Sequence, residues 1–206
     1  MASWTAANGA PQPQDPTTTD FSITAFPVTD IWRRDSTPEG DVFNAPHLTT
    51  AIPISSFKSL KVTVTVPWKT QFDQGGLLII FPEPERAEGG KGSGRWVKGG
   101  IEFFNGSPAL GVVGTDRFSD WSLALMPEGD QSSATFEAVK DGTTLWVYVL
   151  VNGSRQALRE IKWAFIGLHD DDELKVGVYA AKPTPDEGDE KAGVEVTFSG
   201  LSVERS

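Results

Sequence analysis

Trp96-Val97-Lys98-Gly99-Gly100-Ile101-Glu102-Phe103-Phe104 is the segment that decides the fold and carries the candidate site. Side chains of a strand point to opposite faces in turn. As a strand, the segment sends Val97, Ile101 and Phe103 to a plain core face. The opposite face receives Trp96, Lys98, Gly100, Glu102 and Phe104. Such a mixture of aromatic, cationic, glycine and anionic residues is typical of a binding surface.

The neighbouring sequence predicts that this strand lies inside an antiparallel sheet. Residues 74–81 predict the strand before it, and residues 110–115 predict the strand after it. Asn105-Gly106 is the turn signal between strand 96–104 and strand 110–115, because both positions tolerate a positive φ. Residues 60–66 alternate apolar and polar without a break and give the clearest half-buried strand of the chain.

Short strands and turns continue along the rest of the chain. Asp141-Gly142 and Asn152-Gly153 are further hairpin signals, and no segment has convincing helical periodicity. Residues 158–166 fit a strand or a short helix, and their alternation favours the strand. The other predicted strands are 21–25, 42–43, 121–126, 134–140, 144–151, 174–181 and 194–204. This pattern predicts an all-β fold, either a sandwich or a barrel of antiparallel strands.

Length and composition predict one large domain. Residues 1–19 are rich in Ala, Pro, Gln and Thr, which indicates a flexible N-terminal arm. The single β-sandwich domain then covers residues 20–206. Residues 82–95 and 182–193 are rich in Pro, Glu and Gly and are expected to be long loops.

The charge balance excludes two classes of partner. The 206 residues include 18 basic and 28 acidic side chains, for a formal charge of -10. Nucleic acids and anionic membranes require basic patches, so we expect neither as a partner. The N-terminus lacks the features of a signal peptide, and no apolar stretch approaches the roughly 20 residues that span a bilayer. We therefore expect a cytoplasmic protein; without cysteine, it has no thiolate metal site or cysteine nucleophile.

Aromatic and polar residues of several strands are candidates for one ligand site. An aromatic ring stacks on the CH surface of a sugar or another flat organic molecule, while polar groups bind its hydroxyls. The candidate binding residues are Arg33, Gln74, Trp96, Lys98, Glu102, Trp121 and Tyr148. In the alternative interpretation, Lys98 and Glu102 form a cross-strand charge network and the tryptophans only cover the sheet.

A catalytic interpretation of the same strand stays open. Lys98 and Glu102 would be the acid–base pair of an isomerase or cyclase that uses no metal and no cofactor. A glycosidase requires two carboxylates, and the strand has Lys98 and Gly100 where a second acid would stand. Asp73 or Asp120 would have to supply it, so the sequence disfavours glycoside hydrolysis.

A serine triad is a further open alternative. Ser119 or Ser122 would be the nucleophile beside Asp120, and the base would be His47 or His169, which are the two histidines of the chain. The sequence favours a simpler role for Asp120 and Ser122, which is to order the turn below Trp121.

The sequence also contains paired glycines and acidic runs. Gly75-Gly76 and Gly99-Gly100 weaken strands by about 0.5–1 kcal/mol each relative to alanine. A β-bulge is the commonest explanation, and a closely approaching ligand or backbone is the alternative. The acidic runs 170–173 and 186–190 lack the alternating spacing that wraps calcium, so we predict no metal site.

Several motifs together resemble a known family. They are Asp-Gln-Gly-Gly-Leu-Leu (73–78), Trp-Val-Lys-Gly-Gly-Ile-Glu (96–102) and Ser-Asp-Trp-Ser (119–122), supported by residues 29–33, 176–181 and 196–199. The chain resembles the uncharacterised domain family that includes regulation-of-enolase protein 1, within the concanavalin A-like lectin/glucanase superfamily. It is also similar to the C-terminal sandwich of β-xylosidases. The resemblance implies a jelly-roll β-sandwich of two antiparallel sheets and sugar binding on the concave sheet, with no established activity.

The first functional hypothesis is therefore a β-sandwich that binds a carbohydrate or another small organic molecule around Trp96, Lys98 and Glu102. The second is the cofactor-independent isomerase or cyclase. The third is a regulatory module that binds a protein partner, as the name of the family member regulation-of-enolase protein 1 suggests.

Overall fold

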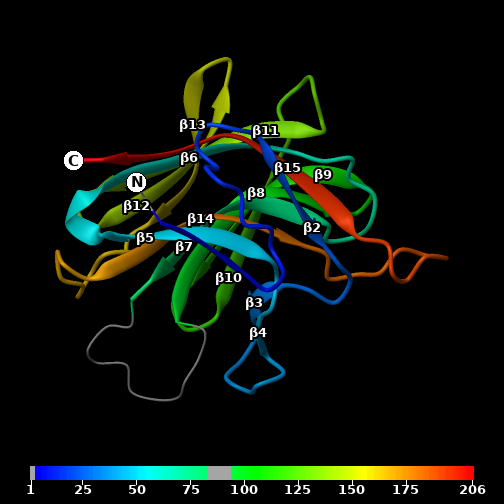
Figure 1. The fold of residues 1–206 in the computed structure, drawn as a ribbon, viewed down its shortest axis with the longest axis horizontal. Coiled ribbons are helices and arrows are strands. Elements are labelled where there is room, and N and C mark those ends of the chain that lie inside the picture. The colour runs from blue at the N-terminus through cyan, green and yellow to red at the C-terminus, as the bar shows by residue number, and fades with distance from the viewer. Residues whose placement is uncertain (1–2, 83–93) are drawn as a thin grey trace.

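The computed structural model describes residues 3–82 and 94–206 and shows a sandwich of two antiparallel sheets (Figure 1). The seven-stranded sheet has the order β1 (Trp4–Ala7), β5 (His47–Pro53), β14 (Glu173–Ala181), β7 (Gln74–Phe81), β8 (Arg95–Phe104), β9 (Ser107–Thr115) and β10 (Ser119–Leu125). The six-stranded sheet has the order β13 (Ser154–Ile161), β12 (Thr144–Val151), β11 (Ser133–Asp141), β6 (Phe57–Thr65), β15 (Val194–Arg205) and β2 (Phe21–Ala25). The prediction of an all-β antiparallel sandwich is confirmed.

Two small elements complete the fold. A hairpin of β3 (Ile31–Arg33) and β4 (Asp41–Phe43) projects at one side of the sandwich (Figure 1). A single 3-10 turn, η1 (Ile54–Ser56), links β5 to β6. Within the described residues, no helix is long and apolar enough to cross a membrane.

The main core lies between the two sheets and follows the predicted alternation. Leu60, Val62 and Val64 of β6 belong to the same buried cluster as Val97 and Ile101 of β8 in the other sheet. Full burial of an aliphatic side chain contributes about 1.5–3 kcal/mol, so these alternating strands hold the sheets together.

A second apolar layer covers part of the outer face of the seven-stranded sheet. Its buried members are Ile31, Ala45, Leu78, Trp96, Val113, Tyr179 and Ala181. The covering residues come from the segment around the β3–β4 hairpin, so β8 is buried on both faces over most of its length. An outer strand face that the sequence predicted to be a surface is thus partly interior.

The paired glycines are explained by close approach of neighbouring chains. β7 and β8 pair without a register shift, with Gly76 opposite Gly100, so the bulge interpretation is wrong. A Cβ on Gly76 would lie 2.1 Å from the carbonyl oxygen of Gly99, and one on Gly100 would lie 2.0 Å from that of Gly75. On the inner face, a Cβ on Gly75 would lie 2.5 Å from Val196 of the other sheet.

The structure differs from the sequence prediction in further places. Residues 4–7, inside the predicted flexible arm, form β1 and pair with β5. Neither β3 nor β5 has a counterpart among the predicted strands. The strand predicted over residues 158–166 ends at Ile161 and is followed by turns. Most of the predicted 82–95 loop lies outside the described residues.

Substituting Gly100 by alanine is expected to destabilise the fold by at least about 2 kcal/mol, because the new methyl group would collide with a backbone carbonyl that cannot rotate away. Gly99→Ala is the matched control, since its Cβ would meet a Val147 methyl group at 3.2 Å. Urea unfolding of both variants tests this. Equal loss of stability in the two variants would contradict the close-approach explanation.

Candidate ligand-binding site

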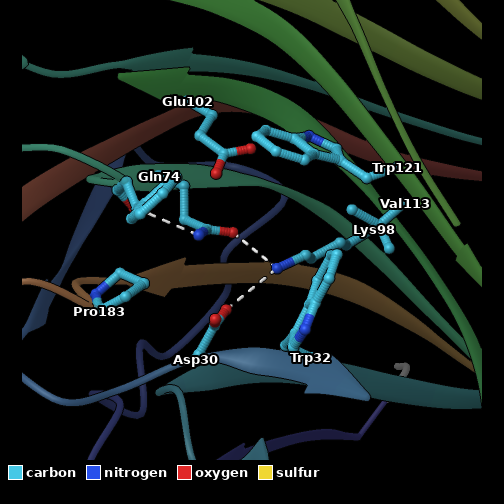
Figure 2. A pocket seen from close by; sticks show the side chains of 9 residues that line it. Asp30, Trp32, Gln74, Lys98, Glu102, Val113, Trp121 and Pro183 are labelled. Atoms are coloured by element: carbon cyan, nitrogen blue, oxygen red, sulfur yellow. Dashed lines mark hydrogen bonds and ion pairs between the residues drawn. The ribbon is translucent and has the colours of Figure 1, made fainter. Parts of the chain in front are cut away.

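A pocket of about 260 Å³ opens on the outer face of the seven-stranded sheet. Its lining comes from β7, β8, β9 and β10 and from three segments that cover the sheet, around Asp30, Phe72 and Pro183. Figure 2 shows Asp30, Trp32, Gln74, Lys98, Glu102, Val113, Trp121 and Pro183 around the pocket, and Phe72 completes the lining. Typical small-molecule pockets measure about 300–1,000 Å³, so this one suits a ligand of about one ring.

A row of glycines lies in the sheet beneath the polar side chains of the pocket. Gly76, Gly100 and Gly111 lie side by side across β7, β8 and β9. On one side of this row Gln74 lies opposite Glu102 in the strand register, and on the other side Lys98 lies opposite Val113. The bare row lets side chains from the two flanking rows lie over it. Lys98 Nζ reaches across the row to Gln74 Oε1 at 2.7 Å, and a Cβ on Gly111 would lie 3.2 Å from Glu102 Oε2.

Lys98 organises the polar end of the pocket. Its Nζ donates to Gln74 Oε1 at 2.7 Å and pairs with Asp30 Oδ1 at 3.1 Å (Figure 2). Gln74 Oε1 also accepts from the Tyr179 hydroxyl at 3.2 Å, and its Nε2 donates to the Phe72 carbonyl at 3.2 Å. These bonds fix the amide orientation. One Lys98 N–H has no partner among these contacts and is available to a ligand.

Glu102 occupies a different electrostatic position. Its side chain points into the pocket (Figure 2) and the residue is 9% exposed. Burial raises the pKa of its carboxyl group from 4.5 to about 7, the positive charge of Lys98 opposes this rise, and the negative charge of Asp30 adds to it. Burial also raises the pKa of the Tyr179 hydroxyl, which therefore stays neutral at ordinary pH.

Aromatic rings form the opposite wall. The Trp121 ring meets Trp32 edge to face at 6.3 Å and 86°, Phe72 at 6.4 Å and 66°, and Phe104 at 5.2 Å and 90°. Trp121 also interacts with the Glu102 carboxyl group and lowers its pKa, although its Nε1 makes no hydrogen bond of full geometry in the structure. Phe72 has a φ of +69°, which is strained for a bulky residue and is found most often near functional sites.

A buried ionic network holds two walls in place. Lys182 Nζ donates to Asp73 Oδ1 at 2.9 Å and to Asp186 Oδ1 at 2.6 Å, and all three residues are at most 4% exposed. Lys69 pairs with Asp186, and the Thr70 backbone donates to Asp73. The cations and donors around Asp186 hold its pKa far below the usual range. The network fixes the segments that carry Phe72 and Pro183.

The structure brings four of the predicted site residues together in the pocket lining, namely Gln74, Lys98, Glu102 and Trp121. Trp96 is on the predicted face but is fully buried beneath Phe43, so it cannot be an open platform. The predicted charge network is also different, since Lys98 pairs with Asp30 from outside the strand.

Two other predicted site residues lie outside the pocket lining. Arg33 pairs with Asp41 at 3.0 Å and donates to the Gly94 carbonyl at 2.7 Å, so it ties the β3–β4 hairpin to the main chain near β8. Tyr148 lies on β12, in the other sheet, where its ring stacks on Trp146 at 5.9 Å. The prediction that Tyr148 shares a face with Lys98 is wrong, because alternation defines a face and not the sheet that carries it.

The structure does not assemble the serine triad. The Ser119 hydroxyl accepts the Arg33 N–H at 2.8 Å, and Asp120 pairs with Arg159 at the edge of the sandwich. His47 Nδ1 lies 3.0 Å from the Ala45 carbonyl, and neither histidine lines the pocket.

Neither acid predicted as a glycosidase partner lines the pocket. Asp120 pairs with Arg159 and Asp73 with Lys182, so both predicted partners for Glu102 are engaged elsewhere. The second carboxylate of the lining is that of Asp30.

Asp30, Trp32, Phe72 and Tyr179 are the site residues that the sequence analysis missed. Within residues 29–33 the sequence pointed to Arg33 as the site residue, whereas the pocket takes Asp30 and Trp32. The outward alternation of residues 174–181 offered a signal for Tyr179, but nothing local places Phe72 over a distant strand.

Glu102→Gln is expected to stabilise the protein at about pH 8 by up to about 3 kcal/mol and to have little effect near pH 4. The raised pKa means that the folded state holds a proton between pH 4.5 and about 7 that the unfolded state has lost. Stability therefore falls as pH rises through this window and stays lower above it, and glutamine removes the effect. Urea unfolding at several pH values tests this; a variant less stable than the parent at pH 8 would contradict it.

Comparisons with known proteins place this chain in a family. The model of the family described as Protein of unknown function (DUF1349) matches residues 8–206. Uncharacterized protein AN7484 of Emericella nidulans is 37% identical over 186 residues, covering 90% of this chain and 86% of that protein. Regulation of enolase protein 1 of Saccharomyces cerevisiae is 26% identical over 178 residues, covering 85% of this chain and 76% of that protein.

Solved structures share the fold. A functionally unknown protein from Saccharomyces cerevisiae has a TM-score of 0.73 at 23% identity, covering 98% of this chain and 96% of that chain. The GH43 protein BlXynB from Bacillus licheniformis has a TM-score of 0.56 at 10% identity, and the match covers 86% of this chain and 31% of that chain. LamA of Z. galactanivorans, in complex with laminaritriose and laminaritetraose, has a TM-score of 0.51 at 9% identity. The match covers 91% of this chain and 78% of that chain. The sandwich is thus similar to concanavalin A-like domains of carbohydrate-active proteins, and the chain belongs to the DUF1349 family.

Proposed function

We propose that the protein binds a small polar ligand of the carbohydrate class in the pocket between Lys98, Glu102 and Trp121. The observation that carries the proposal is a pocket that combines an apolar aromatic wall with a compact polar end. A sugar ring has apolar CH faces and polar edges, so it matches both walls at once.

The contacts that such a ligand would make can be named. The Trp121 ring would stack on the sugar, and the remaining N–H of Lys98 would donate to a hydroxyl. The Glu102 carboxyl group and Asp30 Oδ2 would accept from other hydroxyls. Sugar binding by structurally similar domains supports this ligand class, although fold similarity alone does not assign function.

The cofactor-independent enzyme is the second candidate. It is favoured by the pKa of Glu102, which at about 7 suits a group that both takes up and gives back a proton near neutral pH. Lys98 would then orient the substrate, because its ammonium group is already held by Asp30 and Gln74. Loss of turnover with retained binding in Glu102→Gln would distinguish this candidate from a binding module.

The regulatory role with a protein partner stays a prediction, as does the cytoplasmic location. Leu125 and Val28 are the most exposed of the large apolar side chains in the described residues, and they lie in separate segments. No occupant of either position follows from the structure.

Trp121→Ala is expected to weaken sugar binding at least tenfold, which corresponds to about 1.4 kcal/mol, because it removes the stacking wall. Calorimetric titration with a panel of monosaccharides and short glucans measures this. Trp146→Ala is the matched control, since Trp146 is a partly exposed tryptophan of the other sheet. Absence of binding by every sugar, or equal weakening in both variants, would contradict the proposal.

A further inference from the structure

The charges of the pocket do not balance. Lys98 and Asp30 neutralise each other at 3.1 Å. Within residues 3–82 and 94–206 Glu102 forms no ion pair, although it is almost fully buried and feels the charge of Lys98 from a greater distance. A buried carboxylate without a counter-ion is expensive, and its protonation or an added cation relieves the cost. An anionic ligand would instead meet a pocket whose charges sum to one carboxylate in excess.

The aromatic wall has the form of a cation cage. Trp121, Trp32 and Phe72 line the pocket, and the Trp121 ring is nearly perpendicular to that of Trp32 and steeply inclined to that of Phe72. The face of an aromatic ring attracts a cation through its quadrupole, and several inclined rings together recognise quaternary ammonium groups.

Lys98 does not occupy this cage. Its Nζ lies 5.5 Å from the ring centre of Tyr179 and 5.9 Å from that of Trp96, which both belong to the layer buried beside the pocket. In the described part of the chain, no side-chain cation lies over the rings of Trp32, Phe72 or Trp121. The cage walls are therefore available to a cation that comes with the ligand.

We infer that the pocket takes a ligand with a cationic ammonium group, for which Glu102 is the counter-ion and Trp121, Trp32 and Phe72 are the cage. This inference rests on the proposed small-ligand site and specifies the chemistry of its occupant. The shared chemistry has two sources, namely an amino sugar or a small quaternary ammonium compound.

Binding of such a cation is linked to the proton on Glu102. The titratable and charged groups that face Glu102 are Lys98 on its own strand, Asp30 from the covering segment and Tyr179 from β14. With a pKa of about 7, the ionised share of Glu102 falls from about nine-tenths at pH 8 to about one-tenth at pH 6. A cation that requires the ionised carboxylate therefore binds about tenfold more weakly at pH 6 than at pH 8. Where Glu102 is protonated, binding of the cation releases this proton.

The test compares two matched pairs of ligands by calorimetry on the full chain. Choline and its neutral analogue 3,3-dimethyl-1-butanol differ in charge and little in shape; glucosamine and glucose differ in one amino group. We expect one cationic member to bind at least tenfold more tightly than its neutral partner at about pH 7. The permanently charged choline is also titrated at pH 6 and pH 8, where the tenfold difference is expected if choline is the type of ligand bound.

Glu102→Gln should erase the preference for the cationic member, and thermal unfolding of the variant checks that it is folded. Glu137→Gln is the matched control, because Glu137 is equally buried but pairs with Arg155 in the other sheet. It should keep the preference. A second variant, Trp32→Leu, should weaken the cation more than the neutral partner.

Each outcome decides the inference. A preference for choline indicates the quaternary ammonium class, and a preference for glucosamine alone indicates an amino sugar. Neutral members that bind as tightly as their cationic partners would overturn the inference and leave the proposed sugar site standing. If the sugar panel is silent as well and no ligand of either pair binds, both proposals fall.

Discussion

The contact on which the rest of the structure depends is the approach of two backbones at the centre of the seven-stranded sheet. Gly76 and Gly100 lie opposite each other, and a side chain at either position would collide with the neighbouring carbonyl. The same absence of side chains extends to Gly111 and leaves room above the strands for the side chains of Lys98 and Glu102. One constraint therefore closes the sheet and makes room for the polar groups of the pocket.

The walls of the pocket follow from the residues that flank these glycines. Alternation sends Lys98 and Glu102 outward on either side of the glycine row. Asp30, from the segment before β3, pairs with Lys98. Lys98 is neutralised and Glu102 is not, although both are buried. Burial of an unpaired carboxylate lowers stability at neutral pH. A protein that keeps such a group is consistent with a site whose missing partner is the ligand.

The sequence predicted the fold class and the polar half of the site because both depend on short-range patterns. Period-two alternation assigned Lys98, Gln74 and Glu102 to one face, and Asn105-Gly106 joined two of the strands. It misplaced Tyr148 and Trp96 because alternation does not say which sheet a strand joins or what covers it. Asp30, Trp32 and Phe72 reach the pocket through long-range packing, and β1 forms only because β5 offers an edge.

The most direct test of the account is the titration of the Glu102 carboxyl carbon by NMR in the ligand-free protein, assigned with Glu102→Gln. A midpoint at about pH 7 is expected, because the carboxyl group is buried without a counter-ion. A midpoint near the ordinary value of 4.5 would show a solvated or paired carboxylate and would contradict it.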